Sequence, residues 1–200
     1  ARTCCRKTAA TTKGLSAKRF TAFGTAWCWP PNCTWIPQKQ RKRGWKRSLR
    51  GHLTASLKRL QTDYADLYYL HRINPDIPVE DVAEVMGKLI RDGLIRGYGL
   101  SQVDVDTIER ANAVTPLSAV QNIYSMLERG VEEAVIPYCP AHGIGVVPFS
   151  PVASGFLSGK ITAGTDFSHS DDVRKYVPQL RKENLEANQP ILALLEYCAA

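Results

Sequence analysis

The sequence predicts an α/β protein of parallel strands, an incomplete (β/α)8 TIM barrel. Three observations lead to this prediction. From Ser48 onward, strand-like runs alternate with helix-like runs across short connections, which is typical of βαβ units. No GxGxxG or GxxxxGK[ST] loop occurs, so the phosphate loops that would favour an open sheet over a barrel are absent. A complete barrel typically needs about 250 residues, whereas this chain has 200.

The first three elements follow from spacing and from helix-end signals. Leucines at 49, 53, 57 and 60 fall on one helical face, which predicts a helix over 48–61. An aromatic and aliphatic run, Ala-Asp-Leu-Tyr-Tyr-Leu, predicts a strand over 65–70. Pro78 at a first helical position and Gly93 just past the end delimit the next helix, whose apolar stripe contains Met86.

The alternation continues to the end of the chain. We expect strands over 95–100, 119–123 and 145–149, helices over 103–113, 132–141 and 185–198, and a long polar stretch over 154–182. Pro140 should kink or shorten the helix over 132–141, because proline lacks an N–H group and crowds the preceding turn.

The charge is divided unevenly along the chain. The net charge is +7, yet residues 1–62 hold 15 of the 26 Lys and Arg and no Asp or Glu, so the remainder is acidic. All four Trp and four of the six Cys also lie in residues 1–47. We therefore separate residues 1–47, an atypical segment expected to be disordered or translated out of frame, from a partial barrel over 48–200. The alternative is a basic arm that binds nucleic acid.

Several classes of protein are disfavoured. No cysteine pair has the C-x2-C spacing of a zinc knuckle, so no metal is expected. No run of about 18 apolar residues occurs, so no membrane span is expected. With no secretory apolar region at the N-terminus and widely separated later cysteines, the expected location is the cytoplasm.

Polar or aromatic residues stand at the ends of four predicted strands. These are His71, Ser101, Gln121 and Phe149, and the strand interiors are apolar. In a parallel barrel the carboxyl ends of the strands meet at one rim, where the reactive groups lie. The sequence therefore predicts a ligand-binding rim at these positions.

Four segments around this rim resemble consecutive segments of the aldo-keto reductase family. They are Tyr-Tyr-Leu-His at 68–71, Gly-Leu-Ile-Arg-Gly-Tyr-Gly-Leu-Ser at 93–101, Ala-Val-Gln-Asn-Ile-Tyr-Ser at 119–125, and Pro-Phe-Ser-Pro-Val-Ala-Ser-Gly-Phe-Leu-Ser-Gly-Lys at 148–160. The resemblance covers about residues 48–200 and implies that they form about strands 4–7 of the barrel, with flanking helices.

The resemblance implies an oxidoreductase that transfers hydride from NADPH to an aldehyde or ketone, with NADP(H) as cofactor and a small carbonyl compound as substrate. It implies that His71 orients the substrate carbonyl, that Ser101 and Gln121 hold the nicotinamide carboxamide, and that Phe149 stacks on the nicotinamide ring. The loop that would wrap the pyrophosphate is matched by Ser150, Val152, Gly155, Leu157 and Lys160.

The sequence also departs from the family pattern. The family protonates the new alkoxide with a Tyr that a Lys and an Asp assist, all from earlier strands, but residues 1–62 contain no Tyr and no Asp. Ala22 holds the position of the lysine, and Gln102 replaces the usual Asn or Glu. The expected chain is therefore catalytically incomplete. The basic segment that grips the 2′-phosphate is also not visible, so NADP preference is inherited from the family.

Two further functions stay open at this level. One is a non-catalytic subunit that binds cofactor for regulation, as the potassium-channel β subunits resemble reductases. The other is the basic nucleic-acid-binding arm, although nucleic acid is not the expected partner. Unpaired strand edges of an incomplete barrel also predict self-association of the chain.

Overall fold

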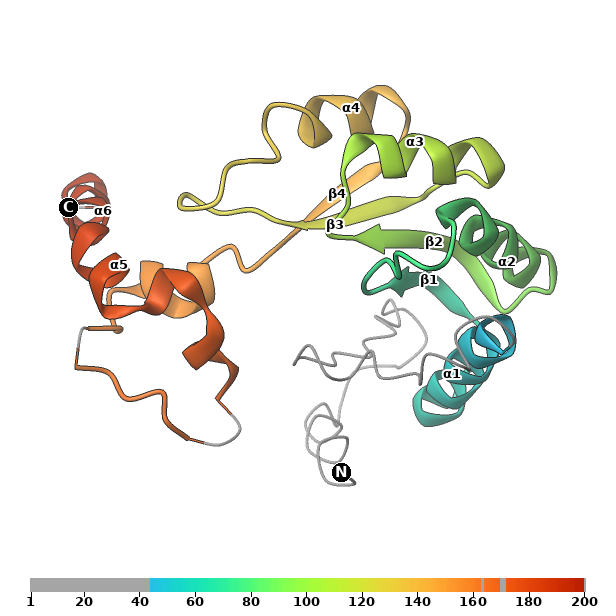
Figure 1. Ribbon diagram of the computed structural model, residues 1–200, viewed down its shortest axis with the longest axis horizontal. Helices are drawn as coiled ribbons and strands as arrows, with labels where there is room; N and C mark the ends of the chain where they lie inside the picture. The colour runs from blue at the N-terminus through green and yellow to red at the C-terminus, as the bar shows by residue number, and fades with distance from the viewer. Residues whose placement is uncertain (1–43, 163, 170–171, 200) are drawn as a thin grey trace.

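The computed structural model describes residues 44–162, 164–169 and 172–199 of the chain. At its centre is a four-stranded parallel sheet whose strands lie in chain order, as Figure 1 shows. The strands are β1 (Ala65–Leu70), β2 (Ile95–Ser101), β3 (Ala119–Ile123) and β4 (Gly145–Phe149). Each successive pair is joined through a helix, so the sheet consists of three βαβ units.

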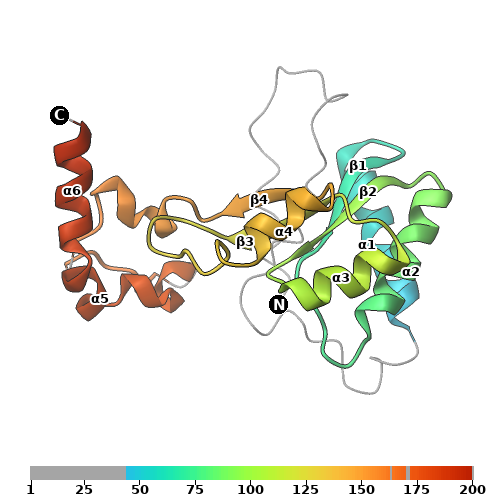
Figure 2. The ribbon, with the colours of Figure 1, turned by 90° about the horizontal axis from the view of Figure 1, so that it is seen from above.

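The helices α1 (Trp45–Leu60), α2 (Val79–Arg91), α3 (Val105–Val114) and α4 (Val135–Ala141) lie along one side of the sheet (Figures 1 and 2). The main hydrophobic core fills the space between these helices and the sheet. Its fully buried side chains include Met86 and Leu89 of α2, Ile108 of α3, and Leu100 and Val120 of the strands. Burial of this apolar surface is the main contribution to stability of the sheet.

The predicted α/β class is confirmed, with four parallel strands that alternate with helices. Three strands have the predicted bounds, and β2 extends one residue further, to Ser101. The strands were predictable because polar or turn-forming residues flank each apolar run. The helix predicted over 48–61 begins earlier, at Trp45, so the last residues of the basic segment are helical. Residues 1–43 of that segment lie outside the described residues.

Helix ends were predicted less accurately than strand ends. The helix predicted over 103–113 is α3, which runs over Val105–Val114. The helix predicted over 132–141 begins at Val135, and Pro140 lies inside its last turn. The helix predicted over 185–198 is two helices, α5 (Lys182–Ala187) and α6 (Gln189–Ala199). The break follows from Pro190, which cannot donate an N–H bond and whose ring would clash with the carbonyl four residues earlier in a continuous helix.

Residues after β4 form a second, smaller hydrophobic cluster around Phe156, which is fully buried. The cluster joins α5 and α6 to two 3-10 helices, η1 (Ala153–Ser158) and η3 (Pro178–Leu180). A third 3-10 helix, η2 (Val173–Tyr176), lies between them in the chain. These elements lie beyond β4 and away from α1–α3 in both views (Figures 1 and 2).

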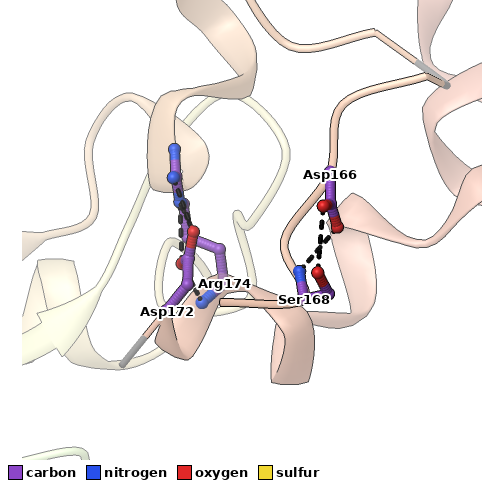
Figure 3. A network of polar contacts seen from close by, with 4 residues as sticks. All are labelled: Asp166, Ser168, Asp172 and Arg174. Carbon is purple, nitrogen blue, oxygen red and sulfur yellow. Dashed lines mark hydrogen bonds and ion pairs between the residues drawn. The ribbon is translucent and has the colours of Figure 1, made fainter. Parts of the chain in front are cut away.

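Local polar contacts hold the long connection in this second cluster (Figure 3). Asp166 accepts hydrogen bonds from the backbone N–H and the hydroxyl of Ser168. Asp172 accepts from the backbone N–H of Arg174 at 2.9 Å and pairs with its guanidinium at 2.6 Å. The connection predicted as a polar stretch over 154–182 thus contains short turns in which an Asp side chain accepts from a backbone N–H two residues further along.

Across the described ranges, no helix combines the length and the apolar character that crossing a membrane requires.

Candidate functional site

The two faces of the sheet can be assigned from one buried tyrosine. Tyr98 of β2 donates a hydrogen bond to the carbonyl oxygen of Thr115 at 2.9 Å, just past the end of α3, so its side chain points toward the helices. Side chains alternate along a strand, so Gly99 and Ser101 lie on the opposite face, which we call the inner face. In a barrel this face points toward the axis.

The strand register shows which residues of β3 and β4 lie on the inner face as well. Ser101 is paired with Gln121, and Gln121 with Val147, so these three form one row on the inner face. Phe149, paired with Ile123, lies two residues further along in the next row. The structure thus brings Ser101, Gln121 and Phe149 to the carboxyl end of one face.

His71 follows β1 directly, and its neighbour Arg72 connects it to the other strand ends. Nη1 of Arg72 donates to the hydroxyl oxygen of Ser101 at 3.0 Å and to the carbonyl oxygen of His71 at 2.5 Å. The guanidinium carbon of Arg72 lies 5.9 Å from the centre of the Phe149 ring, within the range of a cation–π contact. The ends of β1, β2 and β4 therefore meet at Arg72.

The surroundings of His71 favour the neutral imidazole. Burial, and secondarily the positive charge of Arg72, lower the pKa of His71 below its ordinary value. A neutral imidazole carries one N–H donor and one acceptor nitrogen. At neutral pH, His71 can therefore donate a hydrogen bond to an uncharged oxygen without bringing a second positive charge beside Arg72.

The contact of Gln102, which departs from the family pattern, is internal to the sheet. Its backbone N–H donates to the carbonyl oxygen of Gln121 at 3.0 Å, and its side-chain oxygen accepts from the N–H of Ile123 at 3.1 Å. Gln102 has a φ of 57°, in the left-handed region. Gln102 thus fastens the end of β2 to β3 beside the Ser101–Gln121 row.

A buried amide supports the same edge from the helix side. Asn122 is 4% exposed, and its side chain accepts from the N–H of Val103 at 3.1 Å and donates to the carbonyl oxygen of Val103 at 2.8 Å. These two bonds fix the segment that leads from β2 into α3. Both polar atoms of the amide are satisfied, as buried polar groups require.

The loop after β4 turns tightly. Ser150 has a φ of 56°, and its hydroxyl oxygen accepts from the N–H of Ser154 at 3.1 Å. The carbonyl oxygen of Val152 accepts from the N–H groups of Gly155 and Leu157. Val152 itself is exposed.

The predicted loop residues therefore divide into two groups. Ser150 stays next to Phe149 and the strand ends. The Leu157 side chain packs against the second cluster, and a Cβ on Gly155 would lie 3.2 Å from Ile161 of that cluster. The Lys160 N–H donates to the Ser158 hydroxyl at 3.4 Å in the same turn.

The sequence by its local patterns assigns Arg72 no role. Its sequence signal is its position next to His71, since a residue that follows a strand end in a parallel sheet lies at the same edge as the other strand ends. Its contact with Ser101 joins residues 29 positions apart, which no local pattern predicts.

Comparison with known proteins agrees with this architecture. The model of the Aldo/keto reductase family matches residues 18–199, a range that begins inside the basic segment. A Glycine max protein named "Probable aldo-keto reductase 1" is 39% identical over 143 residues, which cover 72% of this chain and 41% of that protein.

Two solved structures are similar as well. A glycerol dehydrogenase from Gluconobacter oxydans has a TM-score of 0.64 and 30% identity over 70% of this chain and 43% of its own. An aldo-keto reductase from Klebsiella pneumoniae in complex with NADPH has a TM-score of 0.51 and 33% identity over 62% of this chain and 43% of its own. The chain thus spans about two fifths of the length of these relatives, and its four strands match part of their barrel. On this evidence the chain belongs to the aldo/keto reductase family.

Proposed function

We propose that this chain carries the nicotinamide side of an aldo-keto reductase site, which in the whole protein transfers hydride from NADPH to an aldehyde or ketone. The observation that carries this proposal is the shared row of Ser101 and Gln121 on the inner face, with Phe149 in the next row. The resemblance of a relative solved with NADPH supports the choice of cofactor.

The residues at the strand ends fit a nicotinamide. Its carboxamide needs one hydrogen-bond donor and one acceptor, which the Ser101 hydroxyl and the Gln121 amide can supply from adjacent strands. Its flat ring needs an aromatic surface, and Phe149 is only partly buried. The bound cofactor would supply the hydride.

The chain's own residues would orient the reactants. His71, neutral at neutral pH, would donate a hydrogen bond to the carbonyl oxygen of the substrate and hold it at the rim. Arg72 beside it would add a positive charge where negative charge develops on that oxygen. Hydride transfer also requires a proton for the alkoxide, and residues 1–62 offer neither the Tyr nor the Asp that the family uses. We therefore expect this chain to bind cofactor without turnover.

Titration of the 200-residue chain with NADPH, followed by the fluorescence of the reduced nicotinamide, tests this proposal. We expect saturable binding, and weaker binding by the Gln121→Ala variant. Gln179→Ala is the matched control, because Gln179 lies in η3 of the second cluster and contacts Glu128 at 3.5 Å. Absence of saturable binding would refute the cofactor site.

Assays for carbonyl reduction with the same preparation test the second part of the proposal. The missing Tyr and Asp favour a chain that binds cofactor without catalysing reduction, which a regulatory subunit would also do. Measurable NADPH oxidation that depends on an aldehyde would contradict the expectation that the proton donor is missing.

A further inference from the structure

We propose that Arg72 is a positioning residue for this site, which fixes the Ser101 hydroxyl and the Phe149 ring in the arrangement that a nicotinamide carboxamide meets. This inference rests on the proposed function. It assigns a role to a residue whose contacts join the ends of three strands. Gln121 of the remaining strand, two residues before the end of β3, is in register with Ser101.

The bond from Arg72 to Ser101 sets the direction of the serine hydroxyl. Guanidinium has only donors, so the Ser101 oxygen must accept in the 3.0 Å contact. Ser101 is 2% exposed, and a buried hydroxyl is costly unless its hydrogen bonds are made. With a lone pair engaged by Arg72, the hydroxyl proton is left to donate. Ser101 would therefore donate to the carboxamide oxygen, and the Gln121 side-chain oxygen would accept from the carboxamide nitrogen.

The contact with Phe149 acts on the ring in the same way. A cation held 5.9 Å from the ring centre is attracted to the aromatic face and favours one orientation of the ring. The guanidinium is itself held, because Arg72 also donates to the carbonyl oxygen of its neighbour His71 at 2.5 Å. One planar group thus restrains both the hydroxyl and the aromatic surface.

A merely structural role for Arg72, as a fastening of the end of β1, would not require its planar fork. The place of its charge can be checked through His71, because burial and, after it, the charge of Arg72 lower the pKa of His71. Replacing Arg72 with Met removes the charge and the donors, whereas Lys keeps the charge and loses the planar fork. A positioning role therefore predicts different outcomes for the two variants.

The first experiment measures dissociation constants of NADPH and of 2′-phospho-ADP-ribose, which lacks the nicotinamide. A hydrogen bond to a charged group contributes about 1.5–3 kcal/mol. We therefore expect Arg72→Met to raise the dissociation constant of NADPH about tenfold or more, and to leave the dissociation constant of 2′-phospho-ADP-ribose unchanged. Ser101→Ala should weaken NADPH binding less when it is made in the Arg72→Met variant than when it is made in the unmodified chain, because the two residues act as one unit. Arg72→Met with unaltered NADPH affinity, or strictly additive effects, would overturn the inference.

The second experiment follows the His71 imidazole by NMR as a function of pH. We expect the pKa of His71 to rise in Arg72→Met and to stay low in Arg72→Lys. Arg96→Met is the matched control, because Arg96 contacts Tyr64 and pairs with Asp66 at the opposite end of the sheet. A His71 pKa that is unchanged in Arg72→Met would overturn the placement of the guanidinium at this rim, on which the inference depends, even if the variant is less stable.

These measurements separate this inference from the proposed function. If the unmodified chain binds no NADPH, the proposed function fails. If it binds NADPH and Arg72→Met binds equally well, only the role of Arg72 fails.

Discussion

A methyl group added at Gly99 should destabilise the sheet and disturb the candidate site together. Gly99 lies on the inner face, in register with Tyr69 on β1 and Ala119 on β3. A Cβ there would lie 2.6 Å from Cδ1 of the Tyr69 ring and 2.7 Å from the carbonyl oxygen of Ala119. The ring could turn only by displacing its neighbours, and the carbonyl belongs to the backbone of β3. Ser101, two residues along the same strand, would move with any shift of β2.

Gly145 provides the control, because it lies in the same row of the sheet. A Cβ there would lie 3.5 Å from the carbonyl oxygen of Ser118 and 3.8 Å from the Ala119 Cβ, which are ordinary contacts. Overpacking of a filled site costs about 1–3 kcal/mol, whereas Gly→Ala without strain stabilises by about 0.4–1 kcal/mol. The free energies of unfolding of Gly99→Ala and Gly145→Ala should therefore differ by about 1.4–4 kcal/mol, with about 2 kcal/mol as a working value.

Urea denaturation followed by far-ultraviolet circular dichroism measures this difference. With a slope of about 2 kcal/mol per molar urea, the midpoints should be separated by about 1 M, with Gly99→Ala lower. NADPH binding should weaken in Gly99→Ala and persist in Gly145→Ala. Equal midpoints for the two variants would show that the inner face is not packed as the register requires.

Three further predictions concern stability and pH. Tyr98→Phe should lower the free energy of unfolding by about 1 kcal/mol, because the carbonyl of Thr115 loses its donor. Asn122→Ala should cost about 2–4 kcal/mol, because both backbone groups of Val103 lose their buried partner; both variants are measured by urea denaturation. Hydrogen bonds and ion pairing with Arg174 lower the pKa of Asp172 to about 2. The ionised carboxylate should therefore stabilise its turn fully above the unfolded pKa of about 3.9, and this stabilisation should be lost as the pH falls toward 2. Amide hydrogen exchange of the turn measures it.

Each of these predictions has an outcome that contradicts it. Unaltered unfolding midpoints in Tyr98→Phe or Asn122→Ala would mean that water replaces the lost partner. Amide protection around Asp172 that is constant between pH 5 and 2 would mean that the ionised carboxylate does not hold the turn. In Asp172→Asn, protection there should not depend on pH, because the amide does not titrate and its oxygen can still accept from the Arg174 N–H, which makes this variant the control.

Much of the sheet could be predicted from the sequence, because each strand is a short apolar run between polar or glycine-containing turns. The helix over Leu185 was the weaker prediction. Its apolar residues continue the helical period across Asn188, but Pro190 interrupts the hydrogen bonds, and the chain starts a new helix at Gln189. An apolar pattern predicts which face of a helix is buried, but it does not predict where the helical hydrogen bonds are interrupted.

The candidate site was partly predictable for a similar reason. Residues at strand ends are found from local boundaries, so Ser101 and Phe149 could be named before their positions were known. Gln121 was expected at a strand end as well but lies two residues before the end of β3, level with Ser101. The contacts of Arg72 could not, because they depend on which strand lies beside which and on the rotamer of a long side chain. The role of Gln102 also needed the structure, since only its left-handed backbone directs the side chain to Ile123.

Local patterns along the chain were enough to predict the α/β class, the order of the elements and the polar residues near the strand ends, because these depend on interactions between residues close in sequence. Which side chains share the inner face, and that Arg72 joins them, became known from the folded arrangement of the strands. Both depend on strand register, since a shift of one residue would move every side chain of a strand to the opposite face.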